Sequence, residues 1–111
     1  ARGSPLYMPP EQMINDSTDE RSDLYAAGIM LFEMLVPKLP LPKFESYEDL
    51  LKQKLLNKKG IFLAKPSELN PFLNMMMDEI VLKAIAYQPE RRFANCCEFK
   101  NTLEEYQKKY L

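Results

Sequence analysis

The sequence contains no histidine and no tryptophan, and its two cysteines, Cys96 and Cys97, are adjacent. Without histidine the chain has no imidazole for acid–base chemistry and lacks a common zinc ligand. Neighbouring cysteines are poorly placed for an ordinary disulfide, so nothing indicates an oxidising compartment, and we expect a cytoplasmic location. The three glycines, Gly3, Gly28 and Gly60, are dispersed. They therefore form no glycine-rich phosphate-binding loop.

An excess of positive charge is also absent, since 15 Lys and Arg face 16 Asp and Glu. Nucleic-acid-binding domains normally carry a basic excess, so we expect no nucleic-acid partner. The longest apolar run, residues 24–36, is interrupted by Glu33. It falls well short of the roughly 20 residues that a membrane span needs, so we expect no membrane contact in this segment. No acidic cluster has metal-ligand spacing and no nucleophile has a base beside it. We therefore expect no catalytic residue, metal site or cofactor site in this chain.

The composition favours a helical domain. The 111 residues suffice for one domain, and 46% of them are hydrophobic, enough for a core. Sixteen leucines and seven methionines greatly outnumber five isoleucines, two valines and two threonines. Because β-branched residues favour strands and leucine and methionine favour helices, the composition predicts an all-α fold, with residues 1–111 as a single domain.

The chain divides into a proline-rich N-terminal loop over residues 1–22 and four predicted helices. Ser22 or Asp23 caps the first helix, which runs to about Val36. Nearly every position from Leu24 to Val36 is apolar or small, so we expect this helix to have no solvent face and to lie at the domain centre. Ser46 begins the second, which ends near Lys58. Apolar positions from Leu73 to Ile85 predict a third helix that ends near Gln88, and residues 61–71 read as irregular. Asn95 with Glu98 forms a capping box for the last, with apolar positions at Cys96, Phe99, Leu103, Tyr106 and Tyr110. The lysines between residues 52 and 65 read as a solvated face.

Four stretches resemble one family, in the family's order. Residues 3–11 read GSPLYMPPE, similar to the end of a protein-kinase activation segment, G-T/S-x-x-Y-x-A-P-E. Residues 22–35 read SDLYAAGIMLFEML and resemble the central αF helix of that family. Residues 40–55 resemble the loop and αG helix that follow. Residues 80–93, IVLKAIAYQPERRF, resemble helix αH and the D-P-x-x-R turn into αI. The resemblance covers essentially the whole chain.

This resemblance implies the helical part of a protein-kinase C-lobe (αF, αG, αH and αI) preceded by an extended activation-segment end. It points to the serine/threonine kinases, whose members transfer the ATP γ-phosphoryl group to protein Ser or Thr with Mg²⁺. The family's Gly-rich loop, ATP-contacting Lys, H-R-D loop and D-F-G Asp precede the activation segment, and none is present in these 111 residues. We therefore expect this chain to be inactive alone and to supply a substrate-positioning loop and a helical scaffold. The alternative is a non-catalytic pseudokinase remnant or a helical protein-interaction module.

The resemblance assigns substrate positioning to three residues. Ser4 is the hydroxyl that, in the family, bonds catalytic-loop groups and helps to orient the acceptor Ser or Thr. Leu6 and Tyr7 help to form the pocket for the substrate residue that follows the acceptor. Read without the family, Ser4 is a turn serine beside Pro5, and Leu6 and Tyr7 are ordinary packing residues.

Structural roles fall to Glu11, Arg92 and Asp23. The resemblance implies a buried ion pair between Glu11 and Arg92, with Arg91 as a neighbouring alternative partner. Glu11 otherwise only begins a polar turn. In the family the Asp23 carboxylate also anchors the catalytic loop, but in this chain we expect it only to cap a helix.

We also expect self-association through the first predicted helix. Its apolar side chains offer more surface than the other three helices can cover: Leu24, Ile29, Met30, Leu31, Phe32 and Leu35. Of the three successive methionines, Met76 and Met77 are expected to pack in the core.

Overall fold

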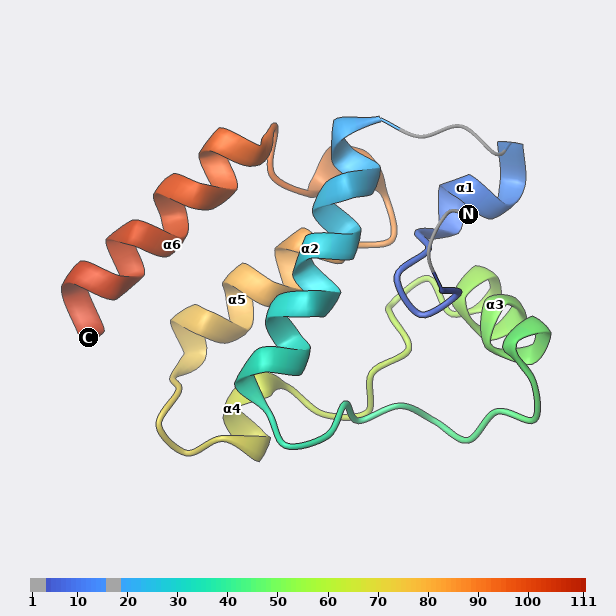
Figure 1. Cartoon of the computed structure of the whole chain (residues 1–111), viewed down its shortest axis with the longest axis horizontal. Helices are drawn as coiled ribbons and strands as arrows, with labels where there is room; N and C mark the ends of the chain where they lie inside the picture. Colours follow the sequence, from blue (N-terminus) through green and yellow to red (C-terminus); the bar gives the residue numbers. More distant parts are fainter. Residues whose placement is uncertain (1–3, 16–18) are drawn as a thin grey trace.

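The computed structural model describes residues 4–15 and 19–111, and this part of the chain is helical with no strand. Figure 1 shows α2 crossing the middle of an elongated molecule of 39 × 28 × 24 Å. The elements are α1 (Pro10–Asn15), α2 (Glu20–Leu35), α3 (Tyr47–Leu56), α4 (Pro66–Leu69), α5 (Met75–Ala84), the 3₁₀ turn η1 (Pro89–Arg91) and α6 (Cys96–Tyr110). The predicted all-α fold is confirmed.

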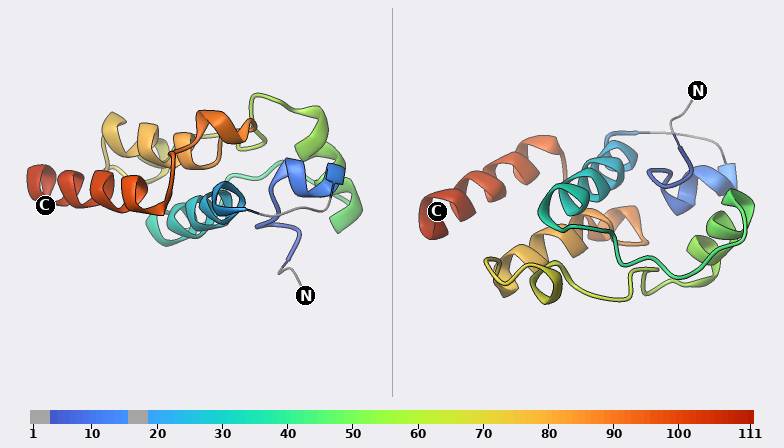
Figure 2. Two further views of the ribbon diagram at one scale, coloured as in Figure 1. Left: turned by 90° about the horizontal axis from the view of Figure 1, so that it is seen from above. Right: turned by 60° about the horizontal axis from the view of Figure 1, so that its bottom comes forward.

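The other helices lie on two opposite sides of α2. Figure 2 shows α4, α5 and α6 on one side of α2, and α1 with α3 on the other. The core is built where α2, α5 and α6 meet. It consists of Leu24, Phe32, Val36, Met77, Ile80, Val81, Ala84, Phe93, Phe99 and Tyr106. The predicted substrate-positioning loop lies on the opposite side of α2 from this core, next to α1 and α3 (Figure 1).

Gly28 allows α2 and α5 to approach closely. A Cβ atom added at this glycine would lie 2.6 Å from Ile85 Cγ2 and 2.8 Å from Ala84 Cβ, closer than side-chain carbons normally approach. Gly60 is a glycine for a different reason, because its φ of 106° is a backbone conformation that L side chains rarely adopt. It does not end α3 itself, whose C-cap is Asn57, but closes the turn after it, where the Gly60 N–H donates to Asn57 O at 3.0 Å.

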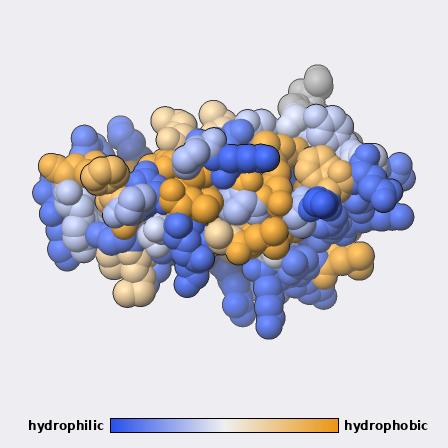
Figure 3. All heavy atoms as spheres, turned by 90° about the horizontal axis from the view of Figure 1, so that it is seen from below, coloured by the Kyte–Doolittle hydropathy of each residue, from blue (hydrophilic) through white to orange (hydrophobic). Residues whose placement is uncertain are grey.

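The expectation that α2 has no solvent face is wrong. Leu24, Ile29 and Phe32 are fully buried, but Met30 is 53% exposed and Met34 is 81% exposed. The helices of this chain therefore cover the inner side chains of α2 and leave a strip toward its end open. Figure 3 shows apolar side chains reaching the surface across the lower face of the molecule. Self-association through α2 stays a prediction.

The N-terminal stretch is more helical than expected. Residues 10–15 form α1, which begins with Pro10 at its first position, where the missing N–H and fixed φ of proline are tolerated. The cap of α2 is Asp19, not Ser22 or Asp23. Its carboxylate accepts hydrogen bonds from the N–H groups of Arg21 (2.9 Å) and Ser22 (3.1 Å). Several residues of the polar run before α2 are good caps, so sequence alone does not choose among them.

The predicted caps of α3 and α6 are confirmed. Ser46 Oγ accepts from Asp49 N at 3.1 Å, and Asn95 Oδ1 accepts from Glu98 N at 2.8 Å. In a capping box the Glu98 side chain would accept from Asn95 N. In this structure Glu98 Oε1 accepts instead from the preceding residue, Ala94 N, at 3.2 Å. Helix α3 ends at Leu56, two residues before its predicted end.

Helix α5 is shorter than predicted at both ends. Asn74 caps it, accepting from Met76 N (3.0 Å) and Met77 N (3.3 Å), so the helix begins after Leu73. It ends at Ala84 instead of near Gln88. The short α4 lies in the stretch expected to be irregular, and buried Asp78 of α5 accepts two hydrogen bonds from Ser67 of α4. Met77 is buried as expected, whereas Met76 is 44% exposed.

Candidate substrate-positioning segment

Residues 4–8, hereafter the entry segment, form a compact turn before α1. Tyr7 N donates to Ser4 O at 3.1 Å and Met8 N donates to Pro5 O at 3.3 Å. Ser4 Oγ accepts from Leu6 N at 3.2 Å, the local bond of a turn serine. The Ser4 side chain is exposed, so its hydroxyl is accessible to a group from outside this chain.

Tyr7 and Leu6 face the end of α2. The Tyr7 hydroxyl donates a hydrogen bond to Glu33 Oε1, and this bond, together with burial and the negative charge of Glu33, raises the pKa of Tyr7. Leu6 and Glu33 line one groove with the proline-rich loop at residues 36–45. The structure therefore brings Leu6 to a groove and bonds Tyr7 to Glu33, a carboxylate that lines the same groove and that the sequence analysis did not select.

Lys54 is a second residue that sequence reasoning missed. The lysines of residues 52–65 were expected to be solvated, but Lys54 is only 2% exposed. Its ammonium donates to three carbonyl oxygens of the entry segment, those of Pro5 (2.8 Å), Leu6 (2.6 Å) and Met8 (2.9 Å). A signal for its burial existed, because Lys54 follows fully buried Leu50 by one helical turn and so lies on the same face of α3.

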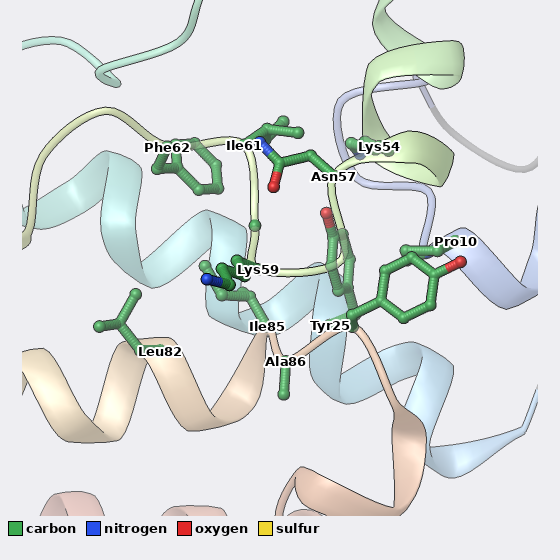
Figure 4. Close-up of a pocket in the computed structure, with 12 residues that line it drawn as sticks. Pro10, Tyr25, Lys54, Asn57, Lys59, Ile61, Phe62, Leu82, Ile85 and Ala86 are labelled. Carbon is green, nitrogen blue, oxygen red and sulfur yellow. The ribbon is translucent and has the colours of Figure 1, made fainter.

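Tyr25 of α2 connects the two buried cations of the site. Lys54 Nζ lies 5.0 Å from the centre of the Tyr25 ring and Arg92 Cζ lies 5.2 Å from it, within the range of cation–π attraction. Figure 4 shows Tyr25 and Lys54 lining a pocket of about 150 Å³ beside Pro10 of α1. Burial raises the pKa of Tyr25 well above its ordinary value, so this phenol stays neutral.

The structure brings Glu11 and Arg92 together. Arg92 Nη1 lies 2.7 Å from Glu11 Oε2 and Nη2 lies 2.8 Å from Oε1, which is the bidentate geometry of a strong Arg–carboxylate pair. The Arg92 side chain is fully buried and that of Glu11 is 21% exposed. Ser22 Oγ also donates to Glu11, at 3.1 Å. The pair ties α1, which directly follows the entry segment, to α2 and η1.

Arg92 also explains the early end of α5. Its Nε donates to Ala86 O at 2.8 Å and its Nη2 to Tyr87 O at 3.2 Å. These carbonyls follow Ala84 and point to the guanidinium. Arg91, the alternative partner for Glu11, is exposed. Asp23 is exposed in the first turn of α2, and its carboxylate makes no hydrogen bond with the other described residues. The cap of α2 is Asp19, so the expected capping role of Asp23 is wrong.

The burial of Lys54 makes stability depend on pH. Burial lowers the pKa of Lys54 to about 7, from 10.5 in an exposed lysine. Between these values the unfolded chain binds a proton that the folded chain releases, so the free energy of unfolding rises with pH. We expect a rise on the order of 1 kcal/mol per pH unit from pH ~7 to ~9. Urea unfolding at several pH values measures this slope.

Lys54→Met should flatten the slope, while Lys52→Met, at an exposed position of the same helix, should preserve it. The window ends near pH 9 because the raised pKa values of Cys96 and Tyr25 contribute with the opposite sign above it. A slope that persists in Lys54→Met would show that another group is responsible.

This arrangement can position a ligand against the entry segment. Within residues 4–15 and 19–111 no group of three acidic or cysteine side chains is placed to hold a metal ion. No helix in the same ranges is long and apolar enough to cross a bilayer. The fold and site define a helical scaffold that presents a short loop beside a groove, with the loop anchored by two buried cations.

Comparisons with known proteins show the family of this chain. The family model for protein tyrosine and serine/threonine kinase matches residues 2–100. Serine/threonine-protein kinase Pkn1 of Myxococcus xanthus is 31% identical over 102 residues, covering 92% of this chain and 14% of the relative. Tyrosine-protein kinase MasK of the same species is 34% identical over 110 residues, covering 99% and 16%. Serine/threonine-protein kinase PknD of Chlamydia trachomatis is 30% identical over 106 residues, covering 94% and 10%.

The chain belongs to the protein kinase domain family. It spans between one tenth and one sixth of the length of these curated relatives. In kinase terms α2 corresponds to αF, α3 to αG, α5 to αH and α6 to αI, and the entry segment is the end of the activation segment.

Proposed function

We propose that this chain is the substrate-side helical part of a serine/threonine protein kinase. The intact protein would transfer the γ-phosphoryl group of ATP, with Mg²⁺, to a Ser or Thr of a protein substrate. ATP and Mg²⁺ would be bound by groups outside these 111 residues, because the family's nucleotide and metal ligands precede the activation segment. The residues of this chain position the substrate.

One observation carries the proposal: the entry segment is attached to the helical scaffold along its own backbone and again directly after its end. Lys54 bonds three of its carbonyls, and the Glu11–Arg92 pair anchors α1 immediately after it. Phosphoryl transfer depends almost wholly on positioning and charge stabilisation, so a rigid loop beside the acceptor is what the reaction needs from this part of the domain. The Ser4 hydroxyl helps to orient the acceptor Ser or Thr of the substrate. Leu6 and Tyr7 form the wall of the pocket for the substrate residue that follows the acceptor.

The test measures the 111-residue chain and the intact kinase in parallel. Calorimetric titration of the 111-residue chain with Mg²⁺–ATP should show no micromolar binding, and the chain should transfer no phosphate to peptides. The intact kinase should phosphorylate peptides that differ only in having Ser, Thr or Tyr as acceptor, with Ser or Thr preferred.

Three results would contradict the proposal. Phosphate transfer by the chain alone would show that it contains catalytic groups. Transfer by the intact kinase to the Tyr peptide only would show the wrong acceptor class, and no transfer to any peptide would favour a pseudokinase.

A further inference from the structure

The structure assigns Lys54 a role in substrate recognition: we propose that it is a positioning residue that holds the entry segment in the conformation that meets the peptide substrate. This inference rests on the proposed function of Ser4, Leu6 and Tyr7. Lys54 lies on α3 and bonds the entry segment through three backbone carbonyls, so it would act on the substrate through other residues.

The first argument is the completeness of the contact. A lysine ammonium has three N–H donors and no acceptor. All three donors are used by carbonyls that lie within four consecutive residues, at 2.6 to 2.9 Å. Carbonyl dipoles that converge on one point repel each other unless a cation lies there. The ammonium therefore stabilises a backbone conformation that the entry segment would not hold with its turn bonds alone.

The second argument is that this backbone conformation sets the positions of Leu6 and Tyr7. The Leu6 carbonyl is bonded to Lys54, while the Leu6 side chain lines the groove beside α2. The peptide unit of Leu6 and Tyr7 is thus fixed from the α3 side, and the Tyr7 hydroxyl is fixed from the α2 side by Glu33. Without the Lys54 bonds, the backbone of the entry segment would be free to move on the side that faces α3. The side chains of Leu6 and Tyr7 would then lose their alignment.

The third argument concerns energy. A lysine buried to 2% exposure pays a desolvation cost that a methionine of similar length does not. The Tyr25 ring, 5.0 Å from Nζ, offsets part of that cost. A residue chosen only to fill this space would be apolar, so the ammonium is there for the three carbonyls.

The experiment uses the intact kinase at pH 6.5, where most of the Lys54 side chains carry the proton, because their pKa is about 7. For Lys54→Met we expect KM for a Ser peptide to rise about tenfold, because a small misplacement of positioning groups costs this much or more. KM for ATP and peptide-independent ATP hydrolysis should stay within about twofold of the wild type, since a positioning residue acts on one substrate only. Lys52→Met, an exposed substitution on the same helix, should leave all of these constants unchanged.

Lys54→Gln is the second variant. It keeps two N–H donors on a side chain one atom shorter, and its peptide KM should lie between those of wild type and Lys54→Met. Hydrogen exchange of the Tyr7 and Met8 amides, which close the turn, should be faster in both Lys54 variants than in Lys52→Met.

The outcomes distinguish this inference from the proposed function. If the wild type phosphorylates the peptide but a folded Lys54→Met shows the same peptide KM, the positioning role is wrong. Equal losses toward peptide and ATP, with a lowered melting temperature, would assign Lys54 to stability alone and overturn it as well. If the wild type phosphorylates no peptide, the proposed function fails first, and the positioning role fails with it.

Discussion

Replacing Arg92 with alanine is expected to lower the free energy of unfolding by on the order of 3–5 kcal/mol, because it leaves a largely buried carboxylate without its partner. The Arg92 guanidinium uses all five of its N–H donors. Two go to Glu11 and three to the carbonyls of Arg21 (2.9 Å), Ala86 (2.8 Å) and Tyr87 (3.2 Å). The substitution therefore removes bonds to α1, α2 and the turn before η1 at once.

Arg91→Ala is the matched control, since this neighbouring arginine is exposed. It should change stability by less than about 0.5 kcal/mol. Urea unfolding followed by far-UV circular dichroism measures both variants. Small and equal effects of the two substitutions would mean that the Glu11–Arg92 pair does not contribute to the folded state in solution.

Gly28→Val is expected to lower the free energy of unfolding by about 3 kcal/mol, at the upper end of the range for overpacked cores. The new Cβ would overlap Ile85 Cγ2 and Ala84 Cβ, and each would have to move before α2 and α5 could pack. Because α2 and α5 supply most of the core, their separation would loosen the whole apolar centre.

Met34→Val serves as the control for the helix propensity of valine, because Met34 is 81% exposed on the same helix. It should cost no more than a few tenths of a kcal/mol. Thermal unfolding of the two variants gives the comparison. A Gly28→Val protein as stable as Met34→Val would show that the two helices are further apart than the structure places them.

Local patterns predicted the elements whose determinants lie within one helical turn. Ser46 and Asn95 cap their helices as expected, since a cap needs only a short polar side chain and the N–H groups of the next three residues. Where several candidates stand together, as before α2, the same rule leaves the choice among Asp19, Ser22 and Asp23 open. The Glu11–Arg92 contact was expected from the family resemblance and not from spacing, because nothing local relates two residues so far apart.

By itself, the sequence determined the helical composition, two of the caps and the family, because these depend on residue type, short spacing and the order of motifs. Tertiary structure alone decided that α5 ends at Ala84, where the carbonyls beyond it turn to Arg92. Tertiary structure also decided that the Lys54 side chain is buried. A lysine on a helix rich in charge is solvated by default, and only the arrival of three carbonyls from 46 to 49 residues away satisfies its ammonium in the interior. That satisfaction depends on contacts between segments distant in the chain, which no local pattern contains.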